Sequence, residues 1–473
     1  MKQEAYRYFC DLCKIPHGSY NEKAISDYLL NFGKELGLDA VQDRALNVLI
    51  RKPGSAGREN EAPIILQSHM DMVCEKNDDV KHDFLKDPII PVLSGDWVKA
   101  KGTTLGADNA AGIGIIMAIL AAKNLSHPPI EALLTTEEEV GCTGAAKFDT
   151  TLLKGKHLIT LDAVKEGVLL AGCSGATIIN TEMAVEREAF PENFSSYKLM
   201  IKGLKGGHSG NDIHKGRGNA NVFMAHLLEK LYTDDIRIIS IKGGSKMNAI
   251  PRECGAVICF DAKVLEKIKS KAARTETELK ARFPSDPDLC ITLEKTDDSG
   301  SVMTRASLRV IIDTVLQTPL AVQSMSPDIP GLVQTSSNPG VIFTDEKRVT
   351  LINFLRSSET MDERLVIGKF RLLERNSAVK VIVSDRAPMW EFKPKSPFRD
   401  KLAAIFMEVY GKAPVITAVH GGLECAVFAE SIPGGEFISF GMEILDAHSP
   451  DERMNMPSFN RTCDFLARIL EKW

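Results

Sequence analysis

The chain has 473 residues, more than one hydrophobic core usually holds, so we expect two or three domains. Hydrophobic residues make up 44% of it and charged residues 26%, as in ordinary globular proteins. The 58 Lys and Arg nearly balance the 63 Asp and Glu, and no long run of one sign occurs. This balance argues against a role in binding nucleic acid or a membrane surface.

No targeting or membrane segment is expected. Residues 1–19 carry scattered charges and no apolar core of a secretory signal. The longest apolar run, 110–122, is too short for a bilayer, which needs about 20 residues, and is interpreted as a buried helix. The ten cysteines lack disulfide-framework spacing, and the single C-x-x-C of Cys10 and Cys13 is interpreted as ordinary thiols. Reduced thiols predict a cytoplasmic location.

The first third of the chain alternates short apolar strands with helices. Strands are predicted at 63–68, 130–136 and 157–163, and helices at 110–122 and 141–149. This order predicts an α/β domain whose sheet is mostly parallel and flanked by helices. Because ligands of such sheets bind beyond the carboxyl ends of the strands, the chemistry is expected directly after each strand.

The pattern of predicted elements changes near residues 186–195, where strand-like segments begin to alternate with charged amphipathic helices. An antiparallel α+β insertion is therefore predicted. Within it, residues 243–262 and 336–358 are weakly similar, since both run from small residues and Asn through a charged turn into a strand. This repeat predicts two similar subdomains.

A Pro-rich stretch at 385–398 returns the chain to helix–strand alternation. The simplest organisation is an α/β domain split by an insertion of about 200 residues. The expected boundaries are 1–187 for the first part of the α/β domain, 188–387 for the insertion and 388–473 for the second part.

Acidic residues and histidines coincide with the strand ends. A single one is more readily explained as a solvated loop residue, but charges beside buried strands are costly unless paired or metal-bound. Adjacent glutamates also repel one another unless a cation neutralises them. The coincidence therefore indicates a metal site, with candidates His69, Asp71, Asp108, Glu137, Glu138, Glu139, Asp162 and His448.

These residue types suit hydrolysis by a metal-activated water. Two histidines and several carboxylates can hold two Zn²⁺ ions with open positions for water. A shared carboxylate would keep the ions about 3.5–4 Å apart. One carboxylate must stay off the metals to take the proton of the attacking water, as a general base.

Four motifs, "SHMDMV", "GTTLGADNAAG", "TTEEEVG" and "AHSPDE", resemble those of the co-catalytic zinc exopeptidases that include peptidase T and carnosinase. Within this family the likeness points to the bacterial aminoacyl-histidine dipeptidases, and it covers nearly the whole chain. The resemblance implies a metallopeptidase that hydrolyses dipeptides, preferentially Xaa-His ones such as carnosine. It also implies two Zn²⁺ per chain, with Co²⁺ or Mn²⁺ able to substitute.

The resemblance assigns five metal ligands. It implies that His69 and Asp162 bind one zinc ion, that Glu139 and His448 bind the other, and that Asp108 bridges the two.

Two further roles follow from the same motifs. Glu138 falls at the family's general base, and Asp71 at the carboxylate that orients the first ligating histidine. Glu137 matches no role in the chemistry.

The insertion resembles the family's lid. Residues 201–221 are rich in Gly and match a lid motif in which His208, and not His214, would help to stabilise the oxyanion. Asn248 and Arg356 match lid positions that contact the substrate, and an Arg suits its carboxylate because the planar guanidinium binds carboxylates bidentately.

The lid is about twice as long as the single lid of smaller members, which use theirs to dimerise. The second copy could supply that surface within one chain, yet a homodimer stays the preferred expectation from the resemblance. Glu424 lies in a motif that lines the site, without a defined role. The segments "AVKEG", after Asp162, and "HGGLECA" depart from the family pattern, which bears on substrate preference.

Two other functions stay open. The first is a hydrolase of the same family with another substrate, either a tripeptide aminopeptidase or an N-acyl amino acid deacylase. The second is a metal-stabilised peptide-binding protein without turnover. A glutamate that binds no metal, Glu138, argues against the second, because a purely structural metal site is closed and needs no base.

Overall fold

The computed structural model describes all residues, 1–473, and divides into two compact units. Unit 1 comprises residues 1–173, 390–419 and 423–473, and unit 2 comprises 174–389 and 420–422. Each unit has a large buried hydrophobic core of its own. None of the helices combines the length and the apolar character needed to cross a membrane.

Unit 1 is a mixed α/β structure. Its helices are α1 (Lys2–Leu12), α2 (Lys23–Glu35), α3 (Ala107–Ala121), α4 (Thr143–Lys147), α9 (Pro397–Tyr410), α10 (Glu424–Ser431) and α11 (Met456–Glu471). Its strands are β1 (Asp39–Gln42), β2 (Val48–Lys52), β3 (Ile64–His69), β4 (Val92–Ser94), β5 (Trp97–Lys99), β6 (Ile130–Thr135), β7 (His157–Thr160), β8 (Val168–Cys173), β22 (Val415–Val419), β23 (Glu436–Ser439), β24 (Ile444–Leu445) and β25 (Arg453–Asn455).

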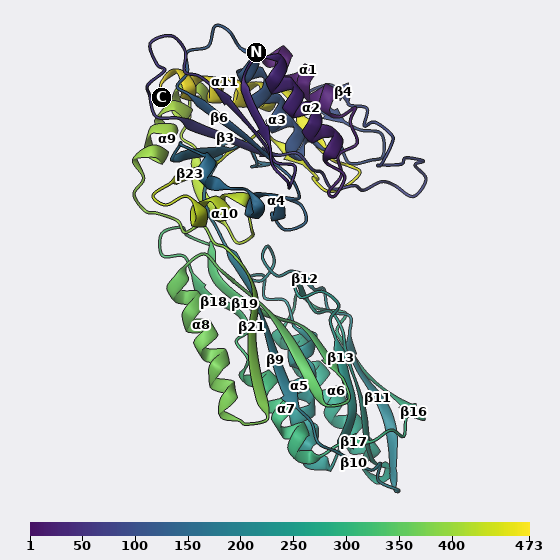
Figure 1. The fold of residues 1–473 in the computed structure, drawn as a ribbon. Helices are drawn as coiled ribbons and strands as arrows, with labels where there is room; N and C mark the ends of the chain where they lie inside the picture. The colour runs from purple at the N-terminus through teal and green to yellow at the C-terminus, as the bar shows by residue number, and fades with distance from the viewer. The chain divides into compact units, whose positions relative to one another are not determined.

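The main sheet of unit 1 has eight strands in the order β1-β2-β6-β3-β7-β23-β8-β22. Strands β6, β3, β7 and β23 run parallel at its centre, and β22 is parallel to β8. The remaining pairs, β1–β2, β2–β6 and β23–β8, are antiparallel. The predicted, mostly parallel sheet flanked by helices is therefore confirmed (Figure 1).

The buried helix predicted at 110–122 is α3. Its sequence from Ala110 to Leu120 is apolar on all sides, and all of these residues are buried. A helix of this composition is stable only when other elements cover it on every side. Helices α1 and α11 pack against α3, and α3 contacts β3, so the entry to α3 is held close to the end of β3.

Unit 2 contains an antiparallel sheet and four long helices. The helices are α5 (Ala220–Leu231), α6 (Leu265–Arg282), α7 (Arg305–Gln317) and α8 (Thr360–Leu372). The strands are β9 (Gly175–Ala184), β10 (Arg187–Glu188), β11 (Phe194–Lys202), β12 (Gly207–His208), β13 (Arg237–Gly243), β14 (Ala249–Ile250), β15 (Cys254–Asp261), β16 (Cys290–Thr296), β17 (Val302–Met303), β18 (Ala321–Met325), β19 (Val333–Thr344), β20 (Arg348–Ser357) and β21 (Val379–Ala387).

The long strands of this sheet lie in the order β16-β11-β15-β13-β19-β20-β9-β21. The first four strands, β16-β11-β15-β13, are the fourth, first, third and second of their group in chain order. Counted from the opposite edge, the last four, β21-β9-β20-β19, are also the fourth, first, third and second of theirs. Strands β13 and β19 pair where the two halves meet. An antiparallel inserted unit, as predicted, is thus present.

The units divide at residues 173/174 and 389/390, and not at the predicted boundaries of 187/188 and 387/388. The physical reason is β9. This strand pairs along its length with β20 and β21, so the residues from 175 to 184 belong to the sheet of unit 2.

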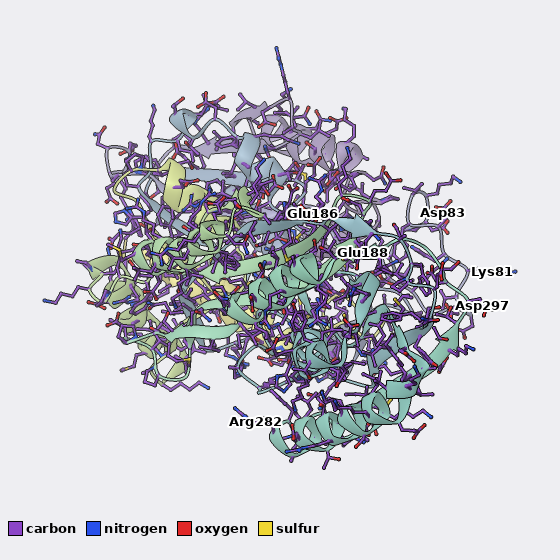
Figure 2. The ribbon with its side chains drawn as sticks, turned by 90° about the horizontal axis from the view of Figure 1, so that it is seen from below. Lys81, Asp83, Glu186, Glu188, Arg282 and Asp297 are labelled. Atoms are coloured by element: carbon purple, nitrogen blue, oxygen red, sulfur yellow. The ribbon has the colours of Figure 1, made fainter.

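The surface carries charges of both signs. Figure 2 labels Lys81, Glu188, Arg282 and Asp297, all of which are exposed. Many such residues form local pairs, for example Arg237 with Glu188 at 2.7 Å.

Candidate metal centre

His69 is the last residue of β3, between β6 and β7 at the centre of the sheet, and its side chain is 1% exposed. Its Nδ1 lies 3.0 Å from the backbone carbonyl oxygen of Asp71 and 3.5 Å from the Oδ1 atom of that residue. A carbonyl oxygen only accepts hydrogen bonds, so Nδ1 carries the proton. Nε2, on the opposite side of the ring, points away from Asp71. This is the orientation of a histidine that can bind a metal through Nε2.

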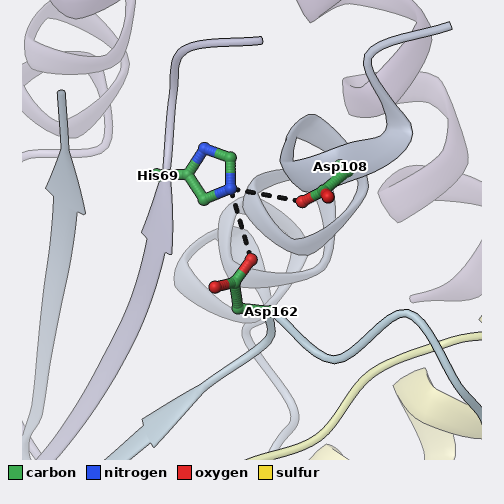
Figure 3. Close-up of side chains that lie close together, drawn as sticks. All are labelled: His69, Asp108 and Asp162. Carbon is green, nitrogen blue, oxygen red and sulfur yellow. Dashed lines mark hydrogen bonds and ion pairs between the residues drawn. The ribbon is translucent and has the colours of Figure 1, made fainter. Parts of the chain in front are cut away.

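Two carboxylates converge on this Nε2 atom (Figure 3). The Oδ1 atoms of Asp108 and Asp162 each lie 3.2 Å from it. Asp108 lies in the first turn of α3, where its backbone departs from helical angles. Asp162 follows β7 by two residues, so both side chains come from the end of the parallel sheet or from the helix beside it.

A second histidine faces the other oxygen of Asp108. The Nε2 atom of His448 lies 3.5 Å from Asp108 Oδ2 and 2.9 Å from Glu139 Oε1. His448 is half exposed and has a positive φ of 63°, an uncommon conformation for a residue with a side chain. Glu137, at the end of β6, has a positive φ of 54°. Irregular backbone of this kind is concentrated at functional sites.

The structure thus brings together all five predicted ligands, with Asp108 between the two histidines. Three groups have ligand atoms within 4.8 Å of one another: His69 with Asp108 and Asp162, Asp108 with Glu139 and His448, and His69 with Glu138 and Glu139. Imidazole and carboxylate groups are suitable ligands for Zn²⁺. The donor set therefore fits a pair of divalent cations.

The carboxylates and the two histidines of the cluster shift one another's pKa values. Burial alone would lower the pKa of His69, but the nearby carboxylates, Asp162 first, hold it well above its usual value. Hydrogen bonds to Asp108 and Glu139 raise the pKa of His448 to about 10. Burial raises the pKa of Asp162 to about 6. Protonated imidazoles thus balance the carboxylates, and metal ions would compete with these protons.

Glu138 lies beside the cluster, in the third group of possible ligands. Burial raises the pKa of its carboxyl group well above the usual value, with the charges of neighbouring acids adding to the effect. Its backbone N–H donates to Asp71 Oδ1 at 3.0 Å, and that of Glu139 donates to Asp71 Oδ2 at 3.2 Å. Asp71 therefore contacts both His69 and the turn that carries the two glutamates.

Glu452 is a supporting residue that sequence reasoning missed. It is 2% exposed, and its carboxylate accepts the backbone N–H groups of four consecutive residues, 105–108, at 2.8–3.3 Å. It thereby fixes the segment that ends in Asp108. The signal available in the sequence was its place in "AHSPDE", four residues after His448, but nothing there indicated its partners.

Glu424, whose role the motif left undefined, is the first residue of α10 and is 1% exposed. Its Oε2 atom accepts hydrogen bonds from Gln67 Nε2 at 2.5 Å and from Thr135 Oγ1 at 2.8 Å. These partners lie near the ends of β3 and β6, so Glu424 links the two strands. Burial raises its pKa to about 8.

The three predicted lid residues lie in unit 2 and are close to one another. Strand β12 pairs with β14, which aligns His208 with Ala249, and the backbone N–H of Ser209 donates to the carbonyl of Asn248 at 2.9 Å. The Nε2 atom of His208 lies 3.3 Å from Arg356 Nη2.

The two ring nitrogens of His208 have different partners. Its Nδ1 accepts the backbone N–H groups of Gly210 and Asn211, both at 3.2 Å, which favours the neutral tautomer with the proton on Nε2. Arg356 Nη2 also only donates, so in this tautomer the two N–H groups lie next to each other without an acceptor. Burial lowers the pKa of His208, and the charge of Arg356 adds to this. The His208 and Arg356 donors therefore converge, which suits an anionic acceptor.

Arg356 is buried and lacks a nearby acid among its hydrogen-bond partners. It is 7% exposed, and its Nε donates to Ser209 Oγ at 3.4 Å. Burial lowers its pKa to about 10, so it stays charged at neutral pH. A buried cation of this kind is stabilised when it binds an anion.

An α/β unit that gathers two histidines and three carboxylates at the ends of its strands has the construction of a metal-dependent hydrolase. Residues 65–472 match the model of peptidase family M20/M25/M40. The chain belongs to this family and is a hydrolase acting on peptide bonds, as the resemblance predicted.

Two relatives match nearly the whole chain. The cytosol non-specific dipeptidase of Escherichia coli (strain K12) is 36% identical over 475 residues, covering 99% of this chain and 97% of that protein. The crystal structure of an aminoacylhistidine dipeptidase from Vibrio alginolyticus is also 36% identical, with a TM-score of 0.90 and coverage of 99% and 96%. Aminopeptidase PepT from Bacillus cereus, 15% identical with a TM-score of 0.58 and coverage of 100% and 98%, shares the fold.

Proposed function

We propose that the chain is a two-zinc dipeptidase that cleaves Xaa-His and similar dipeptides. The observation that carries the proposal is Asp108, whose two carboxylate oxygens face two different histidines, His69 and His448. A carboxylate in this position can join two metal ions. The dipeptide substrate and the preference for His are supported by the names of the E. coli and V. alginolyticus relatives.

The five ligands divide into two sets around Asp108. His69 and Asp162 would hold one zinc ion, Glu139 and His448 the other, and Asp108 both, with Co²⁺ or Mn²⁺ as substitutes. When bound, the ions would supply an activated water and polarise the scissile carbonyl.

Glu138 would move the proton. Its carboxylate would take a proton from the attacking water and pass it to the nitrogen of the leaving amino acid. Burial already favours the protonated carboxyl, so Glu138 is suited to holding this proton between the two steps. Asp71 would keep Glu138 in place through the hydrogen bond to its backbone N–H, and would keep His69 oriented.

Unit 2 would act as the lid and bind the substrate. The Nε2–H of His208 would donate to the oxyanion of the tetrahedral intermediate. Arg356 would bind the carboxylate of the dipeptide, with Asn248 beside it. The convergent donors of His208 and Arg356 support these roles.

The repeated strand order of unit 2 supports a lid made of two similar subdomains. A homodimer stays an expectation from the family resemblance. A cytosolic location is supported by the name of the E. coli relative.

A release assay on zinc-loaded protein tests the proposal. It compares β-Ala-His, Gly-His, Leu-Gly, a tripeptide and an N-acetyl amino acid, each with and without a chelator. We expect chelator-sensitive cleavage that favours the two His-containing dipeptides.

Other results would select the alternatives. A preference for the tripeptide or the acetylated substrate would keep the metal centre and replace the substrate. Zinc binding without cleavage of any of the five would overturn the proposed dipeptide substrate.

A further inference from the structure

A buried amide holds the turn that carries Asn248. Asn338 lies on β19 and is 1% exposed. Its Nδ2 donates to the carbonyl oxygen of Met247 at 2.9 Å and to that of Ala249 at 2.8 Å. These carbonyls belong to the residues on either side of Asn248, so both hydrogens of one amide group fix the backbone around it.

The same turn lies directly on the strand beyond Asn338. A Cβ atom on Gly340 would lie 2.5 Å from the carbonyl oxygen of Met247. A Cβ atom on Gly244, which has a φ of 68°, would collide with the carbonyl oxygen of Gly340. The close approach of the turn to β19 therefore depends on two glycines, and Asn338 supplies the hydrogen bonds at this contact.

The contact extends to His208. The Asn248 carbonyl accepts the N–H of Ser209 at 2.9 Å, and β12–β14 pairing aligns His208 with Ala249. A displacement of the Asn248 turn would therefore move the segment that carries His208. The carbonyl of Ala249, one of the two that Asn338 holds, belongs to the residue paired with His208.

Arg356 is tied to the same strand from the other side. It lies on β20, which pairs with β19 so that Arg356 is opposite Ser336 and Phe354 is opposite Asn338. Strand β19 thus positions Arg356 through its pairing with β20. It positions Asn248 and His208 through the side-chain amide of Asn338.

We propose that Asn338 is a positioning residue that fixes Asn248 and His208 relative to Arg356. The inference rests on the proposed function, in which these three residues bind the dipeptide. Asn338 itself does not touch the substrate. It holds the segments that carry Asn248 and His208 at a fixed distance from Arg356. The three side chains are therefore already in place when the substrate binds, and no conformational entropy is lost in ordering them.

The test uses Asn338→Asp, which keeps the shape of the side chain and removes both N–H donors. The variant would place an oxygen against two carbonyl oxygens and release the turn. Asn353→Asp is a matched control. Asn353 is also buried, on β20, and its Nδ2 donates to two carbonyl oxygens, those of Ile179 and Leu351, at 3.4 Å. It pairs with Pro339, so its side chain points to the opposite face of the sheet from Asn338.

The first readout is amide hydrogen exchange, which needs no substrate. Asn338→Asp is expected to speed exchange in residues 244–250 and 207–211, whereas Asn353→Asp is not. Unchanged exchange in these segments would overturn the inference, whatever the activity.

The second readout separates positioning from a loss of folded protein. Asn338→Asp should raise KM for the dipeptide and lower kcat/KM by about 100-fold, because the substrate-binding side chains would be misplaced in every folded enzyme molecule. Asn353→Asp should reduce only the amount of folded enzyme and leave KM unchanged. An equal KM for wild type and Asn338→Asp would also overturn the inference.

A third variant separates this inference from the proposed function. If Asn248→Ala leaves KM unchanged while Asn338→Asp still speeds exchange, the substrate-binding role of Asn248 fails and the positioning of the loops stands.

Discussion

Asp71 shows how one buried side chain can organise the candidate metal centre. It is fully buried, accepts a hydrogen bond from Ser19 Oγ at 2.8 Å, and accepts the backbone N–H groups of Glu138 and Glu139. It also lies beside the Nδ1 atom of His69. The same carboxylate therefore fixes a ligand from β3 and the turn after β6, which explains why H-x-D occurs at the end of a buried strand.

The base assignment predicts the effect of Glu138→Ala. Because the residue is proposed to move a proton and not to hold the metal, zinc content and fold should stay unchanged. We expect kcat to fall by about 10²–10⁴-fold, measured with the zinc content of the same sample.

Glu137→Gln is the matched control for that variant. Glu137 is the preceding residue, and its side chain bonds Thr143 and Lys147 on the protein surface. Its kcat should stay within a few-fold of wild type. A Glu138→Ala enzyme of near wild-type rate would refute the base assignment, and loss of zinc would make Glu138 a ligand.

The pKa of Glu424 predicts a pH-dependent stability. Burial raises this pKa to about 8, from about 4.3 in the unfolded chain, so the folded state holds a proton that the unfolded state has lost. The stabilising contribution of this proton is complete below about pH 4.3 and is lost as the pH rises towards 8. In metal-free protein the expected slope is at most about 1.4 kcal/mol per pH unit.

The measurement compares urea unfolding of wild type and Glu424→Gln at pH 5.5, 6.5 and 7.5 in the presence of a chelator. The amide cannot ionise, so the free energy of unfolding of wild type should fall relative to that of the variant as the pH rises. A constant difference between the two proteins would show that Glu424 is ionised throughout.

At the scale of elements, the ends of β3, β6 and β7 could be predicted because three short apolar runs alternate with helical segments. The structure places them at 64–69, 130–135 and 157–160, within a few residues of the predicted ranges. The candidate metal ligands could be proposed from the sequence because they follow these strands.

The supporting contacts could not be predicted in the same way. Glu452 and residues 105–108 are more than 340 positions apart, and Asn338 and Met247 are 91 apart. No local pattern of hydrophobic or turn residues indicates such a pair, because the contact exists only after the sheets have formed. The same limit applies to the boundary at β9, whose partners β20 and β21 come far later in the chain.

Glu452 gives a prediction for the loop before α3. Glu452→Ala would leave four backbone N–H groups of residues 105–108 without their acceptor. We expect the free energy of unfolding to fall by about 2–4 kcal/mol, because buried donors without partners are costly. Zinc affinity should also fall, because the same segment positions Asp108.

Glu471→Ala is a suitable control for Glu452→Ala, since Glu471 is an exposed residue near the end of α11 that pairs with Arg468. Its stability should change by less than about 0.5 kcal/mol. Urea unfolding and competition with a metal-sensitive dye measure the two quantities. A Glu452→Ala protein with wild-type zinc affinity would contradict the link to Asp108.

For the whole molecule, the separate cores predict separate responses to metal. All five proposed ligands belong to unit 1, whereas unit 2 has its own buried core. Differential scanning calorimetry should therefore resolve two transitions. Zinc at about 1,000 times its Kd should raise one of them by about 10 °C and leave the other in place.

Chelator addition to the same sample provides the control, because it should return the first transition to its metal-free temperature. A single transition that moves as a whole would show that the units unfold together. Two transitions that both move would place a metal ligand in unit 2.

The chain leaves and re-enters unit 1 at neighbouring points. The N–H of Cys173 donates to the carbonyl of Trp390 at 2.9 Å, and the N–H of Trp390 donates to that of Cys173 at 3.1 Å. The 216 residues between them are therefore one long insertion into unit 1, and a single antiparallel β-bridge joins its two ends. A short hairpin could close the same bridge, so an ancestral hydrolase could gain, lose or exchange such an insertion without rebuilding its metal-binding half.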